Sequence, residues 1–143
     1  MRIRIAWIAV AALVAALTPT IAAGGGAGTT ELYATMKGGN EVPKGDPKAS
    51  GTAEIKLTGT KVCWEFKLKG VKGPSAAHIH KGGAGKAGPV VVPFGTKFKR
   101  TGCTTASNAI VKAILSRPGG YYVNVHTAKY PAGAVRGQLS KGT

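Results

Sequence analysis

Acidic residues are scarce in this chain. Five Asp and Glu residues stand against 20 Lys and Arg, and Asp46 is the single aspartate. No two carboxylates have a spacing that indicates a catalytic acid–base pair, and Ser75 has no acidic partner with which to form a triad with His78. The composition therefore disfavours hydrolytic chemistry.

Long apolar runs are also missing, except at the N-terminus. Ile5 to Leu17 is a run of 13 apolar residues behind a basic head that contains Arg2 and Arg4. A membrane-spanning helix needs about 20 such residues. A basic head, a short apolar run and the small residues of 18–24 are typical of a secretory signal peptide.

This leader sets the expected domain organisation. We expect residues 1–23 to be the signal peptide, residues 24–30 a flexible linker, and residues 31–141 a single domain. The mature protein is then secreted or periplasmic and has no transmembrane segment.

Only two cysteines are present, Cys63 and Cys103, and neither lies in a CxxC motif. In a secreted chain an even number of cysteines favours a disulfide over thiolate metal ligation. A bridge across about 40 residues would stabilise the fold by up to ~4 kcal/mol in the chain-entropy description.

The surplus of positive charge indicates an anionic partner. Without the two leader arginines the chain has 18 basic and five acidic residues, a net charge of +13. Such a surface attracts anionic cell-envelope or matrix polymers, or acidic extracellular proteins, and nothing indicates specific nucleic-acid binding. Lys56, Lys67 and Lys69 are candidate contacts. The alternative is that the lysines keep a β protein soluble and block edge pairing.

Alternation of apolar and polar residues predicts an all-β fold. Residues 53–57 and 62–68 alternate on either side of Gly59-Thr60, which indicates a hairpin. One short helix is expected from Ser107 or Asn108 to Leu115. We predict an antiparallel β-sandwich, Ig-like or superoxide-dismutase-like, with this one helical segment. Further strands are expected at 31–36, 76–80, 90–94, 98–100, 121–126 and 133–139.

The histidines carry the most specific chemistry. His78 and His80 lie two residues apart in an expected strand, so both side chains leave the same face. His126 ends another expected strand. If Ile79 and Val125 point into the core, all three imidazoles point outward and form a metal site. The alternative is three surface histidines bonded to backbone or water.

A glycine-rich segment, 83–88, follows the histidine pair. Its letters match the dinucleotide-binding pattern GxGxxG, but that motif must open a helix, and Pro89 and Val90 begin an expected strand instead. We interpret residues 83–88 as a loop that shields or admits a ligand at the histidines.

Arg136 is expected on the same face. A strand at 133–139 that pairs with 121–126 would place Arg136 and Gln138 beside Asn124 and His126. Because acids are few, Arg136 is a candidate anion contact. An arginine bonded to backbone carbonyls, or merely exposed, is the alternative.

Several motifs together resemble the CHRD domain, named after the repeated domain of chordin. The resemblance covers about residues 30 to 140 and implies an extracellular β module, here as a bacterial secreted stand-alone copy. It implies no established activity. The motifs are Gly38–Pro43, Ala77–Gly82, Gly85, Gly88–Pro93, Tyr121–Thr127, Tyr130-Pro131, Gly133 and Arg136–Leu139.

A more local likeness is to copper-zinc superoxide dismutases, in which an HxH strand and a distant histidine hold copper. His78, His80 and His126 would take those roles. The chain has no further histidine to bridge to zinc, and it lacks the acid-bearing zinc loop.

Three functional hypotheses follow. The first is binding of a transition metal through the three histidines, with copper favoured and zinc possible, since copper leads the affinity order for imidazole sites. The second is a non-enzymatic module that binds anionic envelope or matrix material. The third is a superoxide dismutase-like copper enzyme. No residue is assigned a catalytic role.

Overall fold

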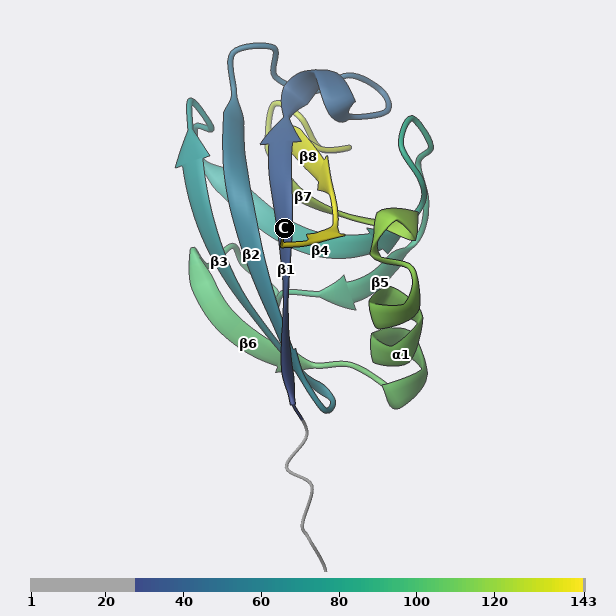
Figure 1. The fold of residues 1–143 in the computed structure, drawn as a ribbon. Helices are drawn as coiled ribbons and strands as arrows, with labels where there is room; N and C mark the ends of the chain where they lie inside the picture. The colour runs from purple at the N-terminus through teal and green to yellow at the C-terminus, as the bar shows by residue number, and fades with distance from the viewer. Residues whose placement is uncertain (1–27, 143) are drawn as a thin grey trace, which may run out of the picture.

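The computed structural model describes residues 28–142 (Figure 1). The expected signal peptide and residues 24–27 of the expected linker lie outside the described residues. Within residues 28–142 no helix is long and apolar enough to cross a membrane.

Nine strands and one α-helix make up the described chain, with two short 3-10 turns. The strands are β1 (Thr29–Lys37), β2 (Ser50–Thr58), β3 (Lys61–Lys69), β4 (Pro74–Lys81), β5 (Val90–Pro93), β6 (Thr101–Thr105), β7 (Tyr121–Thr127), β8 (Val135–Gln138) and β9 (Ser140–Lys141). The helix is α1 (Asn108–Ser116), and the turns are η1 (Gly38–Asn40) and η2 (Pro118–Gly120).

The strands form one antiparallel sheet in the order β5-β4-β7-β8-β1-β2-β3-β6, with β9 added beside β1. The sheet curls so that the β4–β7 layer crosses behind the β1–β3 layer (Figure 1). The two layers are joined where Lys37 of β1 lies opposite Arg136 of β8. The predicted all-β antiparallel fold is thus confirmed, with layers that are continuous rather than separate.

The core lies between these layers and follows the alternation in the sequence. In the predicted hairpin, Ile55 of β2 lies opposite Trp64 of β3, and both are buried. Ile79 and Val123 are buried from the other layer. Strands β2 and β3 therefore present their apolar faces inward and their polar faces outward.

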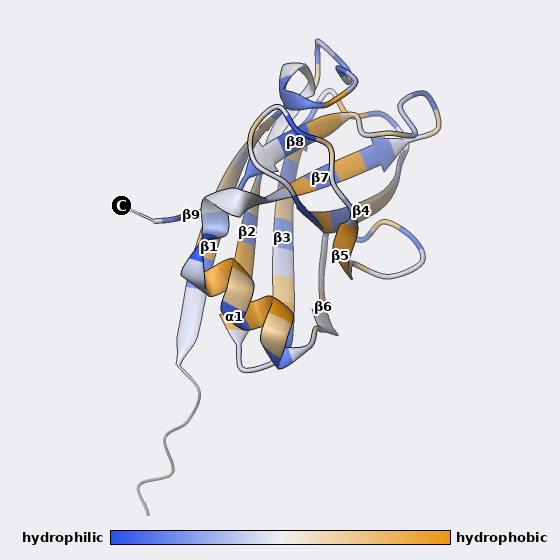
Figure 2. Ribbon diagram, turned by 90° about the vertical axis from the view of Figure 1, so that its right-hand side faces the viewer, coloured by the Kyte–Doolittle hydropathy of each residue, from blue (hydrophilic) through white to orange (hydrophobic). Residues whose placement is uncertain are grey.

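The predicted helix is confirmed as α1, and it covers one side of the curled sheet (Figure 2). Ser107 caps it by accepting a hydrogen bond from the Ile110 N–H. Val111 and Ile114 lie on one helix face and pack into the core.

Two strand predictions need correction. The strand expected at 98–100 is instead β6, at Thr101–Thr105, which pairs with β3. Its residues are polar or small, so no apolar alternation marks them. Gly102 is required there because a Cβ would lie 2.6 Å from the Trp64 ring. The first strand, expected at 31–36, is β1 and already begins at Thr29.

The predicted disulfide is confirmed. Cys63 and Cys103 are directly opposite each other on β3 and β6, with Cα atoms 4.0 Å apart, and their sulfurs are bonded. The bridge fastens the polar strand β6 to the sheet.

Candidate metal centre

The three histidines meet on the outer face of the β4–β7 layer. His78 and His80 come from β4 and His126 from β7, and one ring nitrogen from each lies within 4.8 Å of those of the other two. Their neighbours Ile79 and Val125 are fully buried in the core on the opposite face. The predicted outward orientation of the three imidazoles is therefore confirmed.

A hydrogen bond to Pro131 assigns the proton of His126 to Nδ1. Its Nδ1 lies 2.9 Å from the Pro131 carbonyl oxygen, which can only accept, so Nδ1 carries the proton. Nε2 then offers a lone pair to the centre of the cluster. It lies 3.0 Å from Nδ1 of His78, which can donate to it, and 3.0 Å from Oδ1 of Asn124, an oxygen that also only accepts and so forms no hydrogen bond with this lone pair.

His80 is oriented by a backbone carbonyl in the same way. Its Nδ1 donates to the Gly88 carbonyl at 2.8 Å. Its Nε2 is buried and has no hydrogen-bond partner among the described residues. A buried acceptor without a partner is costly, and a bound cation would satisfy it.

The surroundings keep the imidazoles of His78 and His80 neutral. Burial, together with the neighbouring His126 and His80, lowers the pKa of His78 to about 4. Burial also lowers the pKa of His80, against the opposing effects of its bond to Gly88 and of the nearby Asn124 side chain. Neutral imidazole is the form that ligates a metal, so both side chains are in the ligating state at pH 7.

The aromatic ring of Tyr122 packs against His80. Tyr122 on β7 lies opposite His80 in the sheet, and the two rings stack with centroids 4.8 Å apart and planes 8° apart. The Arg136 guanidinium on β8 lies 3.3 Å from the Tyr122 centroid. Because β4 and β8 flank β7 on opposite sides, Tyr122 is held between the two groups.

Arg136 also anchors the glycine-rich loop. It is 1% exposed, and it donates to the carbonyls of Gly83 at 2.7 Å and Lys86 at 2.9 Å. Gln138 donates to the Gly82 carbonyl at 2.9 Å. Arg136 is therefore bonded to backbone carbonyls, which the sequence left open as the alternative to an anion contact.

The loop therefore closes over the histidine pair. The Gly88 N–H donates to the Tyr122 hydroxyl, and the Gly88 carbonyl accepts from His80. The loop leads into β5 and not into a helix, which confirms that its glycines do not form a dinucleotide-binding turn. The position of its main chain sets the tautomer of a candidate metal ligand.

Glu41 is a buried residue that sequence reasoning missed. It is 4% exposed, and its Oε1 has no hydrogen-bond partner among the described residues. Burial raises its pKa to about 7, although Arg136 and a hydrogen bond from Asn124 act in the opposite direction. It fits closely against Gly133, where a Cβ would overlap the carboxylate. Its one signal in the sequence was its place in the Gly38–Pro43 motif.

Comparison with known proteins gives one match. The family described as CHRD domain matches residues 32–139, which include the three histidines, Arg136 and Glu41. Neither the curated proteins nor the solved structures contain a match to the chain.

Proposed function

Starting from a chain that belongs to the CHRD domain family, we propose that His78, His80 and His126 bind one transition-metal ion, with copper favoured over zinc. The observation that carries this proposal is the buried Nε2 of His80, which has no hydrogen-bond partner within residues 28–142 and lies in a cluster with two other imidazole nitrogens. The protein would bind or handle copper outside the cytoplasm.

The spacing of the nitrogens supports a shared ion. Nδ1 of His78 and Nε2 of His126 are 3.0 Å apart, and one nitrogen from each of the three histidines lies within 4.8 Å of the other two. The three side chains would therefore reach one ion after small movements. Copper is favoured because it leads the affinity order for imidazole sites.

The ligands are also held in the way that metal-binding histidines usually are. His80 and His126 each donate their other ring N–H to a backbone carbonyl, which fixes the tautomer that aims Nε2 at the metal. Within residues 28–142 no aspartate or glutamate belongs to the cluster, so the three neutral imidazoles would leave the charge of a bound divalent ion uncompensated.

A binding role is preferred to dismutase chemistry. A superoxide-consuming enzyme would use a free positive charge near the metal to guide the anion. Arg136, the candidate for that task, is buried and donates to Gly83 and Lys86. We therefore assign no catalytic residue.

The test is copper titration of protein purified without a histidine tag. We expect one Cu(II) per chain, with nitrogen hyperfine structure in the electron paramagnetic resonance spectrum. His78→Ala, His80→Ala and His126→Ala should each weaken binding at least roughly a hundredfold. Lys72→Ala, at an exposed position, is the control and should bind as the wild type does. Binding that survives all three histidine substitutions would refute the proposal.

A further inference from the structure

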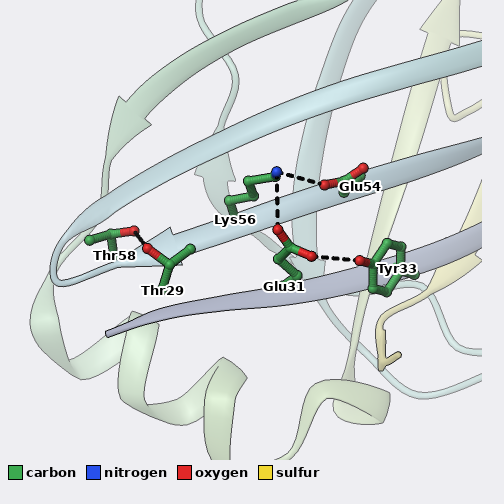
Figure 3. Close-up of polar contacts among 6 residues, drawn as sticks. All are labelled: Thr29, Glu31, Tyr33, Glu54, Lys56 and Thr58. Atoms are coloured by element: carbon green, nitrogen blue, oxygen red, sulfur yellow. Dashed lines mark hydrogen bonds and ion pairs between the residues drawn. The ribbon is translucent and has the colours of Figure 1, made fainter. Parts of the chain in front are cut away.

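The acidic residues are unevenly distributed over the molecule. Glu31 and Glu54 both pair with Lys56 at 3.0 Å on the outer face of β1 and β2, and Tyr33 donates to Glu31 (Figure 3). Glu65 lies opposite Glu54 on that face. Lys56, a candidate anion contact in the sequence, is thus already neutralised. The unopposed positive charge must lie elsewhere.

Three lysines surround a hollow at one end of the curled sheet. Lys48 precedes β2, Lys72 lies between β3 and β4, and Lys129 lies between β7 and β8. The hollow has a volume of about 420 Å³, and Asp46, Thr127 and Tyr130 also line it. None of the three lysines forms a salt bridge within residues 28–142.

The loops that carry these lysines are packed against one another. Gly70 has a φ of +75° and lies so close to the Lys48 carbonyl that a Cβ would be 2.7 Å from its oxygen. The Asp46 N–H donates to the Ala134 carbonyl at 2.9 Å. The three loops that carry the lysines therefore pack together at this end of the sheet.

The charge inside the hollow is positive. Asp46 is its only carboxylate, and one oxygen of Asp46 accepts from the Lys48 N–H at 3.0 Å. The lining residues include three lysines and this one carboxylate, so their net charge is +2. Nζ of Lys129 lies 5.4 Å from the Tyr130 ring centroid, and this contact limits the orientations of the lysine side chain.

We propose that this hollow binds an anionic glycan through a phosphate, sulfate or carboxylate substituent. Lysine ammonium groups attract such groups as point charges and do not demand the planar geometry that arginine does. Thr127 offers a hydroxyl, and Tyr130 offers a hydroxyl and a ring for the sugar. A concave site admits one anionic substituent of a glycan, whereas a flat bilayer surface would contact only the rim of the hollow. The argument for this hollow does not rest on the proposed metal site.

The experiment compares two triple variants with equal loss of charge. Lys48→Gln/Lys72→Gln/Lys129→Gln removes the hollow lysines, and Lys61→Gln/Lys67→Gln/Lys69→Gln removes exposed lysines of β3 as the matched control. The probe is a sulfated heparin hexasaccharide added to metal-free protein, measured by calorimetry and by backbone amide shifts. We expect the hollow variant to bind roughly tenfold more weakly and the control to change less than about twofold.

The amide shifts give a local readout. The largest changes on titration should fall at Thr127 and Tyr130, and they should disappear in the hollow variant. Equal weakening in both triple variants would overturn the proposal in favour of diffuse charge. Preferential binding to phosphatidylglycerol vesicles over the hexasaccharide would overturn it in favour of a membrane surface.

Discussion

The imidazole of His80 lies parallel to the ring of Tyr122, with centroids 4.8 Å apart. This contact positions the candidate ligand by packing. Tyr122→Ala should lower the free energy of unfolding of the metal-free protein by about 3 kcal/mol, because a buried ring is lost and His80 loses its support. Urea denaturation measures the change.

Tyr122→Phe is the control for this prediction. It keeps the stacked ring and removes the hydroxyl to which the Gly88 N–H donates. We expect a loss of about 1 kcal/mol or less. Equal losses in the two variants would show that the hydroxyl, and not the ring, supports the site.

Arg136→Met should release the glycine-rich loop. The carbonyls of Gly83 and Lys86 lose their donors, so the free energy of unfolding should fall by about 2 to 3 kcal/mol. Amide hydrogen exchange at residues 82–88 should accelerate. Arg100→Met is the control, since exposed Arg100 donates to the Phe66 carbonyl far from this loop, and it should leave that exchange unchanged.

Glu41 should make stability depend on pH. Its pKa is about 7 in the folded protein against an ordinary value of 4.5, so the folded state holds the proton more tightly. The free energy of unfolding therefore falls as pH rises from about 4.5 to about 7. Glu41→Gln should remove this loss and be more stable than the wild type at pH 8, by on the order of 1 kcal/mol.

The comparison at pH 4 completes this experiment. Glu41 is protonated there in both states, so wild type and Glu41→Gln should differ little. Glu65→Gln, at an exposed position, is the matched control and should show no such pH dependence. A Glu41→Gln variant that is less stable at pH 8 would mean that the carboxylate is held as a stabilising anion.

Loss of the disulfide should destabilise the fold. Cys63→Ser/Cys103→Ser opens a loop of 40 residues and should lower the free energy of unfolding by up to about 4 kcal/mol. Reductant should have a similar effect on the wild type and none on the double variant. Unreduced peptide mapping of protein from its native compartment should show the linked pair, and two free thiols there would contradict the prediction.

The alternation of apolar and polar residues predicted much of this structure, because it depends only on residues that are neighbours in the sequence. The alternation around Gly59-Thr60 defines which residues of β2 and β3 face the core. The same two-residue period predicted that His78 and His80 share a face and that Arg136 lies near Asn124, its partner in the sheet. A period of two needs no knowledge of distant residues.

What the sequence could not reveal depends on distant contacts. His80 is buried because the glycine-rich loop closes over it, and that loop is held by Arg136, 50 residues beyond Lys86. Glu41 lies near Asn124, although the two residues are far apart in the sequence. Strand β6 lacks an apolar face, so only its pairing with β3 and the disulfide define it.

The turn between β7 and β8 belongs to both proposed sites. Its Pro131 carbonyl orients His126, and its Lys129 lines the lysine hollow. A glycan that displaced this turn would alter the affinity of the imidazoles for a metal. Thermodynamic linkage then requires the metal to change glycan affinity by the same factor. Through this one short backbone segment, a bound glycan would tune how strongly the protein holds its metal, and a bound metal would tune how strongly it holds the glycan.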